Sequence, residues 1–347
     1  MMKNGGEIFT ERGLIDLISR FAGSVTSKQV VRGIGDDCAV IDAGPDTVWL
    51  VTVDTLVEGI HFDPSWHPYT LLGRKAASVN ISDIAAMGGV PKFALLSLAV
   101  SGETDLAAVE DFMTGFSAVL QENNTVLIGG DTVKNKSNVF SITLIGEANK
   151  EKILLRSKAL PGDSIWVSGG LGEAAAGLEL CRRGLVDSRE WRPLVMAHLD
   201  PEPQVLIGRH LAESGRIYAA IDLSDGLATD LAHLCAASGT GAEIYQQELP
   251  CSSLLKSAAA FLQMSLDDLI LRGGEDYQLL FTAAPGDDKG IKRLVHEKTG
   301  RDIFKIGRMT GKAGVFLAPG RECGAADLRD ITFQGYDHFA EPSASGS

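Results

Sequence analysis

The sequence predicts an α/β protein of two lobes, each built from a β-sheet with packed helices. Short β-branched runs alternate with segments of helical periodicity along the chain. The 347 residues are enough for about two hydrophobic cores. A polar stretch, EANKEKILLRSKALPGD, interrupts the pattern near the middle. We therefore expect an N-terminal domain over residues 1–150, a C-terminal α/β domain over 151–340 and a disordered tail over 341–347.

Helices and strands alternate through the predicted N-terminal domain. Apolar residues recur at helical spacing over residues 10–21 and near 105–122. A longer helix is expected to begin with Thr70 as its N-cap and to stop at Gly88, Gly89 and Pro91. Strands are expected in the β-branched and apolar runs 49–55, 92–100, 125–130 and 139–146.

The predicted C-terminal domain begins with a strand over 164–170 and a helix over 171–183, and later the strand IYAAIDLSDG leads into a helix over 227–238. The two domains share one short sequence similarity, because residues 80–83 (NISD) resemble residues 222–225 (DLSD). Four residues do not establish a repeat. Two lobes that each present a Ser-Asp pair would nevertheless suit a site built between them.

The composition restricts the class of protein. The net charge of −13 argues against nucleic acid and anionic membranes as partners, because both require a basic face. The N-terminal residues lack the apolar stretch of a signal peptide, and runs such as FALLSLAV are too short to span a bilayer. The five cysteines are scattered and form no CxxC pair, which favours a reducing, cytoplasmic location.

Acidic residues occupy unusual positions in this sequence. In GIGDDCAV, two adjacent aspartates follow a glycine turn with no obvious basic partner. Others are expected at the ends of apolar strands, beside paired glycines or near the end of a helix. The set comprises Asp37, Asp54, Asp83, Asp131, Asp222, Asp225, Glu275 and Asp276. Each alone is typical of a solvated or structural acid, but together, without a His or Cys cluster, they favour a hard cation such as Mg²⁺, Mn²⁺ or Ca²⁺ with phosphate ligands.

The nucleotide-binding signals are weaker. The chain has no GxxxxGK[ST] loop, and SGGLGEAAAGL departs from GxGxxG at Ala175. Its strand, paired glycines and helix could cradle an anion or form a plain turn. Positive charge for phosphates is sparse, with Lys75, Lys134, Arg156 and Arg272 as candidates. We therefore expect metal ions to neutralise most of the phosphate charge.

Taken together and in order, these motifs resemble the thiamine-monophosphate kinase family. They are GIGDDCAV, VTVDTLVEGIHF, VNISDIAAMGG, LIGGDT, AIDLSDGLATDL, GGEDYQLLF and GYDHF. The resemblance spans about residues 7–339 and extends to the wider aminoimidazole ribonucleotide synthetase-like superfamily. It implies a two-lobed fold, a homodimer formed through the N-terminal lobes, and the use of ATP and several Mg²⁺ ions to phosphorylate thiamine monophosphate to thiamine diphosphate.

The resemblance also implies roles for individual residues at the matching motif positions. Magnesium would be bound by Asp37, Thr52, Val53, Asp54, Asp83, Asp131, Asp222 and Asp225. ATP would be contacted by Gly130, Asp131, Arg156 and Ser224. The thiamine moiety would face His61, Glu275 and Phe333. Two positions depart from many members, since Val53 replaces a hydroxyl residue and offers only its backbone carbonyl, and Phe333 replaces a tryptophan.

The expected reaction needs no protein nucleophile. The acceptor is a phosphate whose second pKa is about 6, so it is mostly anionic at neutral pH. We expect direct, in-line phosphoryl transfer, with Cys38 as a small core residue and Asp36 holding its turn. The alternatives are a sibling ATP-dependent synthetase or dehydratase of the same superfamily, or a non-catalytic dimer that binds metal and nucleotide.

Overall fold

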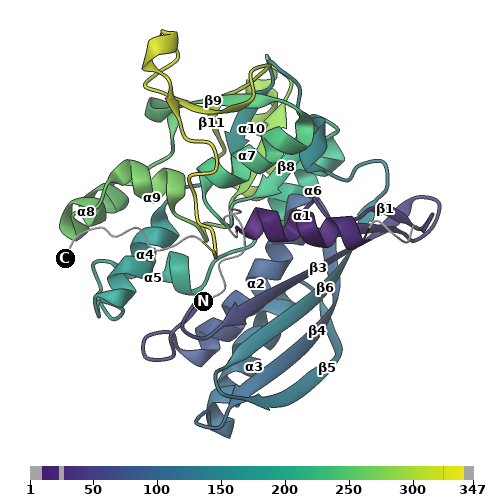
Figure 1. Ribbon diagram of the computed structural model, residues 1–347, viewed down its shortest axis with the longest axis vertical. Coiled ribbons are helices and arrows are strands. Elements are labelled where there is room, and N and C mark those ends of the chain that lie inside the picture. Colours follow the sequence, from purple (N-terminus) through teal and green to yellow (C-terminus); the bar gives the residue numbers. More distant parts are fainter. Residues whose placement is uncertain (1–9, 23–26, 323, 340–347) are drawn as a thin grey trace, which may run out of the picture.

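The computed structural model describes residues 10–22, 27–322 and 324–339, so the expected tail over 341–347 lies outside the described residues. The chain forms two lobes, each with its own sheet, and the fold is α/β as the sequence predicts (Figure 1). Among the described residues, no helix has both the length and the apolar character needed to cross a bilayer.

The N-terminal lobe is a six-stranded sheet covered on one face by helices α2 (Tyr69–Ala86) and α3 (Leu106–Glu122) (Figure 1). The strand order is β1-β2-β3-β6-β4-β5. These strands are β1 (Val30–Arg32), β2 (Ala39–Asp42), β3 (Thr47–Val57), β4 (Val90–Ser101), β5 (Val126–Asn135) and β6 (Val139–Asn149). Alternate residues of β3 and β6 are buried against the helices. The described residues on the other face of these strands are half-buried or exposed, and we call it the uncovered face.

The C-terminal lobe contains a seven-stranded, mostly antiparallel sheet with the order β13-β12-β9-β11-β7-β10-β8. Its strands are β7 (Ser164–Val167), β8 (Ile217–Asp222), β9 (Gly241–Tyr245), β10 (Leu279–Ala283), β11 (Phe304–Thr310), β12 (Gly314–Ala318) and β13 (Arg329–Asp330). Its helices are α4 (Glu173–Arg182), α5 (Arg192–Leu199), α6 (Val205–Ser214), α7 (Leu227–Ser238), α8 (Ser253–Leu262), α9 (Leu266–Arg272) and α10 (Asp288–Thr299).

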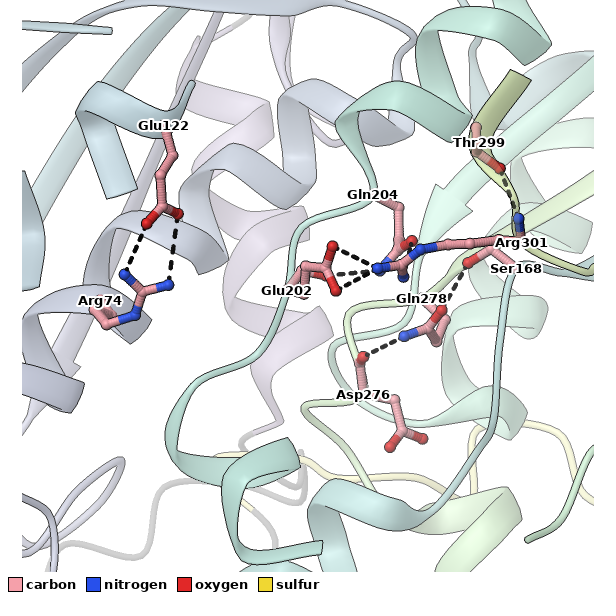
Figure 2. A network of polar contacts seen from close by, with 9 residues as sticks. All are labelled: Arg74, Glu122, Ser168, Glu202, Gln204, Asp276, Gln278, Thr299 and Arg301. Carbon is pink, nitrogen blue, oxygen red and sulfur yellow. Dashed lines mark hydrogen bonds and ion pairs between the residues drawn. The ribbon is translucent and has the colours of Figure 1, made fainter. Parts of the chain in front are cut away.

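Helix α2 joins the two lobes. It is buried over most of its length, because one side packs on the N-terminal sheet and another meets α6 and β8. Its last turn contributes Ala85 and Ala86 to a hydrophobic cluster that also contains Trp166 and Phe281 of the C-terminal sheet. At its first turns, Arg74 pairs with Glu122 at the end of α3 (Figure 2) and with Asp200 after α5. The lobes therefore share one continuous apolar and ionic contact.

The sequence-based expectation about where helix α2 begins is wrong. Thr70 lies inside α2, whose N-cap is Pro68 with no side-chain cap, so Thr70 does not begin the helix. The helix starts earlier because Pro68 comes just before its first turn. Proline has a fixed φ and no backbone N–H, and an N–H at this end of a helix has no acceptor within the helix. At the next helix, α3, Asp105 is the N-cap, and its carboxylate accepts from the Ala108 N–H.

Helix α1 (Glu11–Ala22) confirms the predicted amphipathic helix at residues 10–21, although it buries none of its residues. Four of its apolar side chains, Ile15, Leu17, Ile18 and Phe21, are exposed. The helix lies across the N-terminal lobe near β1 (Figure 1), and Arg12 stacks over the ring of Phe333 at 4.8 Å.

Candidate active site

The acidic residues of the two lobes meet at α2. Asp37 precedes β2, Asp83 lies in the last turn of α2, and Asp222 ends β8. One carboxylate oxygen from each lies within 4.8 Å of the other two. The NISD and DLSD segments that echo each other in the sequence are in direct contact, because the Ser82 hydroxyl donates to Asp222 at 2.6 Å.

Burial and mutual repulsion set the protonation of this cluster. Burial, together with the charge of Asp37, raises the pKa of Asp222 to about 8. Burial and the charges of Asp54 and Asp222 raise the pKa of Asp83 well above its usual range. Asp54 has a pKa of about 6, raised by burial and by Asp37. Carboxylates this close hold protons unless a cation neutralises them.

Asp37 and its neighbour have basic partners, contrary to the expectation from the sequence. The Arg156 guanidinium hydrogen-bonds Asp37, and its backbone N–H donates to Asp36 at 3.2 Å. Arg32 lies 3.4 Å from Asp36. Arg156 is distant from Asp37 in sequence, and Arg32 is placed beside the Asp36 turn by strand β1. Neither pairing could therefore be predicted from the sequence. Burial of the Asp37 carboxyl still raises its pKa despite Arg156.

Strand β3 contributes to the site from its middle rather than from its end. Thr52 donates its hydroxyl to Asp83, and the backbone N–H of Asp54 donates to the Asn80 side chain at 3.0 Å. Both Thr52 and Asp54 face the helices, whereas Val53 points to the uncovered face and is 61% exposed. The prediction that Asp54 ends its strand is wrong, because the apolar alternation continues to Val57.

Asp225 lies one turn beyond Asp222, just before α7. The carboxylate of Asp230 accepts from the N–H groups of Asp225 and Gly226, both at 3.1 Å, and so fixes the turn. Burial, and next the charge of Glu11, raise the pKa of Asp225 to about 6. Ser224 has its carbonyl bonded to the N–H of Glu275 at 2.8 Å, which ties this turn to the GGED segment.

Asp131 is not part of the acidic cluster of its own chain. The expected strand end at Gly130 is wrong, since β5 continues through both glycines to Asn135. The register runs from Asp131 to Ser97 on β4, to Ser141 on β6 and to Thr55 on β3. This path crosses three strand spacings, or about 14 Å, and ends on the face opposite Asp54.

Gly130 has a steric reason to be glycine. A Cβ there would lie 1.8 Å from the carbonyl oxygen of Leu96. The register of β4 and β5 shifts between Ala94 and Leu95, which marks a bulge just before Gly130. The second glycine of LIGGDT is therefore required by the close approach of two strands, and both glycines and Asp131 are exposed to solvent.

Of the residues expected to face the thiamine moiety, Phe333 lies on the C-terminal segment, and this segment also reaches His61. Phe333 packs edge-on against His233 of α7, with ring centroids 5.2 Å apart. The segment then bonds to the N-terminal turn of α7, since Tyr336 N–H donates to the Asp225 carbonyl at 2.9 Å. His338 reaches the His61 ring at 5.0 Å. His61, Phe333 and Asp225 are thus linked by one continuous strip of chain.

The two acids of GGEDY have separate surroundings. Glu275 is paired with Lys75 and His198. The carboxylate of Asp276 instead accepts from the backbone N–H groups of Gly172 and Ala174 at the start of α4. Its carbonyl accepts from Gln278, whose side chain also binds Ser168 (Figure 2). The anion site suggested by SGGLGE is therefore filled by a carboxylate of the chain itself.

The residues that hold these acids were not predicted from the sequence. Asn80 and Ser82 lie in the motif NISD, three residues and one residue before Asp83. Their place in this motif could have indicated that they bond to the acids. Asp230 lies five residues after Asp225 in LSDGLATD, at the start of a predicted helix. Lys75 was considered for phosphate, but its side chain is fully buried.

Comparison with known proteins agrees with this architecture. Residues 35–148 match the family described as AIR synthase related protein, N-terminal domain, and residues 161–318 match its C-terminal domain. The fold and site thus define an AIR synthase related protein.

Sequence relatives are more specific. The thiamine-monophosphate kinase of Haemophilus influenzae is 36% identical over 338 residues, which is 95% of this chain and 98% of that protein. The solved structure of AaThiL complexed with AMPPCP and TMP is 33% identical, with a TM-score of 0.80 over 93% of this chain and 98% of that one. Thiamine-monophosphate kinase from Stenotrophomonas maltophilia K279a is 34% identical, with a TM-score of 0.73 over 90% and 98%. The chain therefore belongs to the thiamine-monophosphate kinase family, as its motifs predict.

Proposed function

We propose that this protein is a kinase that transfers the γ-phosphoryl group of ATP to thiamine monophosphate, giving ADP and thiamine diphosphate. The observation that carries the proposal is the buried cluster of Asp37, Asp83 and Asp222, contributed by both lobes of a chain that belongs to this kinase family. The complex of AaThiL with AMPPCP, an ATP analogue, and TMP supports both substrates.

The cluster fits magnesium as the metal of this reaction. Its donors are carboxylate oxygens with no histidine or cysteine among them, and they are the ligands that a hard cation prefers. We assign Asp37, Asp83 and Asp222 as central ligands, with Thr52, the carbonyl of Val53, Asp54 and Asp225 beside them. Bound Mg²⁺ would neutralise the charge of the ATP phosphates and of the acceptor phosphate.

The remaining assignments follow from the family motifs and from the strip of chain around Asp225. We assign Gly130, Asp131, Arg156 and Ser224 to ATP, and His61, Glu275 and Phe333 to the thiamine moiety. Residues 1–150 would supply the metal-binding and dimerisation domain, and residues 151–340 would complete the site. The free thiols of Cys38, Cys181 and Cys235 support a cytoplasmic location.

The chain's own residues bind and orient the reactants and do not form a covalent intermediate. The acceptor phosphate oxygen forms a bond to the γ-phosphorus as the bond from that phosphorus to the bridging oxygen of ADP breaks. The acceptor is already anionic, so no residue has to remove a proton from it. Arg156 carries positive charge beside Asp37 and could contact the nucleotide from there.

Two experiments test this function. The purified protein with ATP, Mg²⁺ and thiamine monophosphate should form thiamine diphosphate, and failure to form it would refute the proposal. ATP with a chiral γ-thiophosphate should give product with inverted configuration at phosphorus. Retention of configuration, or labelled phosphate trapped on the protein, would contradict direct transfer.

We also propose a homodimer that pairs through the N-terminal lobes. Strand β5 is an edge strand of ten residues, exposed along its whole length, and it carries the apolar residues Val126, Leu127, Ile128 and Val133. A long, flat, apolar edge is a site of association unless something covers it. A second copy would cover it, and would bring Asp131 of one chain toward the acidic cluster of the other.

A further inference from the structure

A second buried polar cluster joins the two lobes. Lys75 on α2 places its Nζ 2.6 Å from Glu275 Oε1, and His198 on α5 places its Nδ1 2.9 Å from Glu275 Oε2. The side chains of Lys75 and His198 are 0% and 1% exposed. The rings of His67 and Trp66 pack against His198 at a tilt, with ring centroids 6.2 Å and 5.7 Å away.

Lys75 is unsuited to bind phosphate itself. Its ammonium is enclosed, and among the described residues its ion-pair partner is Glu275. Taking an ammonium out of water is costly unless a charge compensates it, so the pair holds together firmly. Removing Lys75 would leave the Glu275 carboxylate with one partner and freedom to turn.

The backbone around Glu275 is also fixed. Its φ of +68° is in the left-handed region, which is uncommon for a residue with a side chain. Its N–H bonds to Ser224, and the N–H of Tyr277 bonds to the Leu223 carbonyl at 2.8 Å. The ion pairs and the backbone hydrogen bonds therefore hold the Glu275 carboxylate beside the DLSD turn.

Glu275 still has acceptor capacity. A carboxylate offers about four lone-pair positions, and the two partners named above use one on each oxygen. Its side chain keeps 24% exposure.

We propose that Lys75 and His198 are positioning residues that hold the Glu275 carboxylate as the hydrogen-bond acceptor for the vitamin part of the acceptor substrate. This inference rests on the proposed function. The aminopyrimidine of thiamine carries N–H donors and its thiazolium carries positive charge, and a fixed carboxylate suits both. The nucleotide is bound by other residues, so its affinity should be independent of the cluster.

The test compares steady-state constants for both substrates in matched variants. Lys75→Met keeps the length of the side chain without its charge, and should raise KM for thiamine monophosphate about tenfold while KM for ATP stays within about twofold. Adding Glu275→Gln to Lys75→Met should cost little more, because coupled residues are not additive. Lys298→Met, on the exposed face of α10, is the control.

A second pair of variants separates positioning from folding. His198→Asn keeps an amide N–H near the position of Nδ1 and should retain a KM near that of the wild type, whereas His198→Leu should raise it. Well-folded Lys75→Met and His198→Leu proteins with unchanged KM for thiamine monophosphate would overturn the inference. If Lys75→Met does not fold, the His198 pair decides. A wild-type protein without kinase activity would instead refute the proposed function, and this inference with it.

Discussion

Asp222 lies where three acids converge, and both burial and the charge of Asp37 disfavour the charged form of its carboxyl group. Asp222→Asn should abolish thiamine diphosphate formation, because an amide replaces a ligand oxygen that carries charge. At pH 8 and above, the same change should raise the melting temperature of the metal-free protein, because there it removes a charge that Asp37 repels. Asp187→Asn, at an exposed position between α4 and α5, should alter neither property. Turnover and melting curves of the variants check this, and an active Asp222→Asn enzyme would contradict the ligand assignment.

The same carboxylate gives a pH dependence of stability. Its pKa is about 8 in the folded protein and about 4 in an unfolded chain, so the folded state holds the proton more tightly. Its contribution to stability is therefore present at low pH and is lost as the pH rises toward 8. In chelator, the melting temperature should fall between about pH 6 and about pH 8, and excess Mg²⁺ should reduce this fall. Equal slopes with and without Mg²⁺ would count against a cation site.

At the residue scale, the sequence was enough to predict the acids but not the groups that hold them. Asp37, Asp83 and Asp222 lie in recognisable motifs, and the structure brings those three together. The pairing of Arg156 with Asp37 joins positions 119 residues apart, and no local pattern encodes such a contact. The same is true of the contacts that His198 makes with Glu275.

At the scale of elements, α2 determines how closely the lobes approach. A Cβ on Gly208 of α6 would lie 2.0 Å from the backbone oxygen of Ala85. Gly208→Ala should therefore separate α2 from α6 and destabilise the protein by about 1–3 kcal/mol, as overpacking typically does. Gly311→Ala is the control, since nothing lies within 4 Å of its added Cβ. Urea unfolding measures both, and equal midpoints would show that the helices have room to adjust.

Most helices and strands could be predicted from hydrophobic periodicity and from the positions of glycine and proline, but some of their ends could not. The helices at α1, α3, α4 and α7 fall where apolar spacing predicts them. Strands β3 and β5 continue beyond the positions where Asp54 and Gly130 suggested an end. In β5, Gly130 permits a close approach to Leu96 of the neighbouring strand instead of forming a turn, and this contact cannot be read from the local sequence.

At the scale of the whole molecule, the acidic cluster draws on both lobes, and the role proposed for Asp131 needs a second copy of the chain. Two faces of the N-terminal sheet have different roles, because one carries Asp54 toward α2 and the other is uncovered beside β5. A dimer through β5 would use the uncovered face and edge. Asp131 lies three strand spacings from the strand that carries Asp54. In such a dimer, we predict that Asp131 of one subunit acts in the site of the other.

Mixing two inactive variants tests that arrangement. Asp131→Asn and Asp222→Asn should each be inactive as homodimers. If Asp131 acts in the partner's site, a mixed dimer of the two variants contains one intact site and one site that lacks both acids. Random exchange of subunits should then restore about a quarter of wild-type activity, because half of the dimers are mixed and each has one working site. If Asp131 acts within its own chain, every site in the mixture lacks one acid and no activity returns. Sedimentation of the wild-type protein supplies the control, since a monomer at assay concentration would refute the shared site directly.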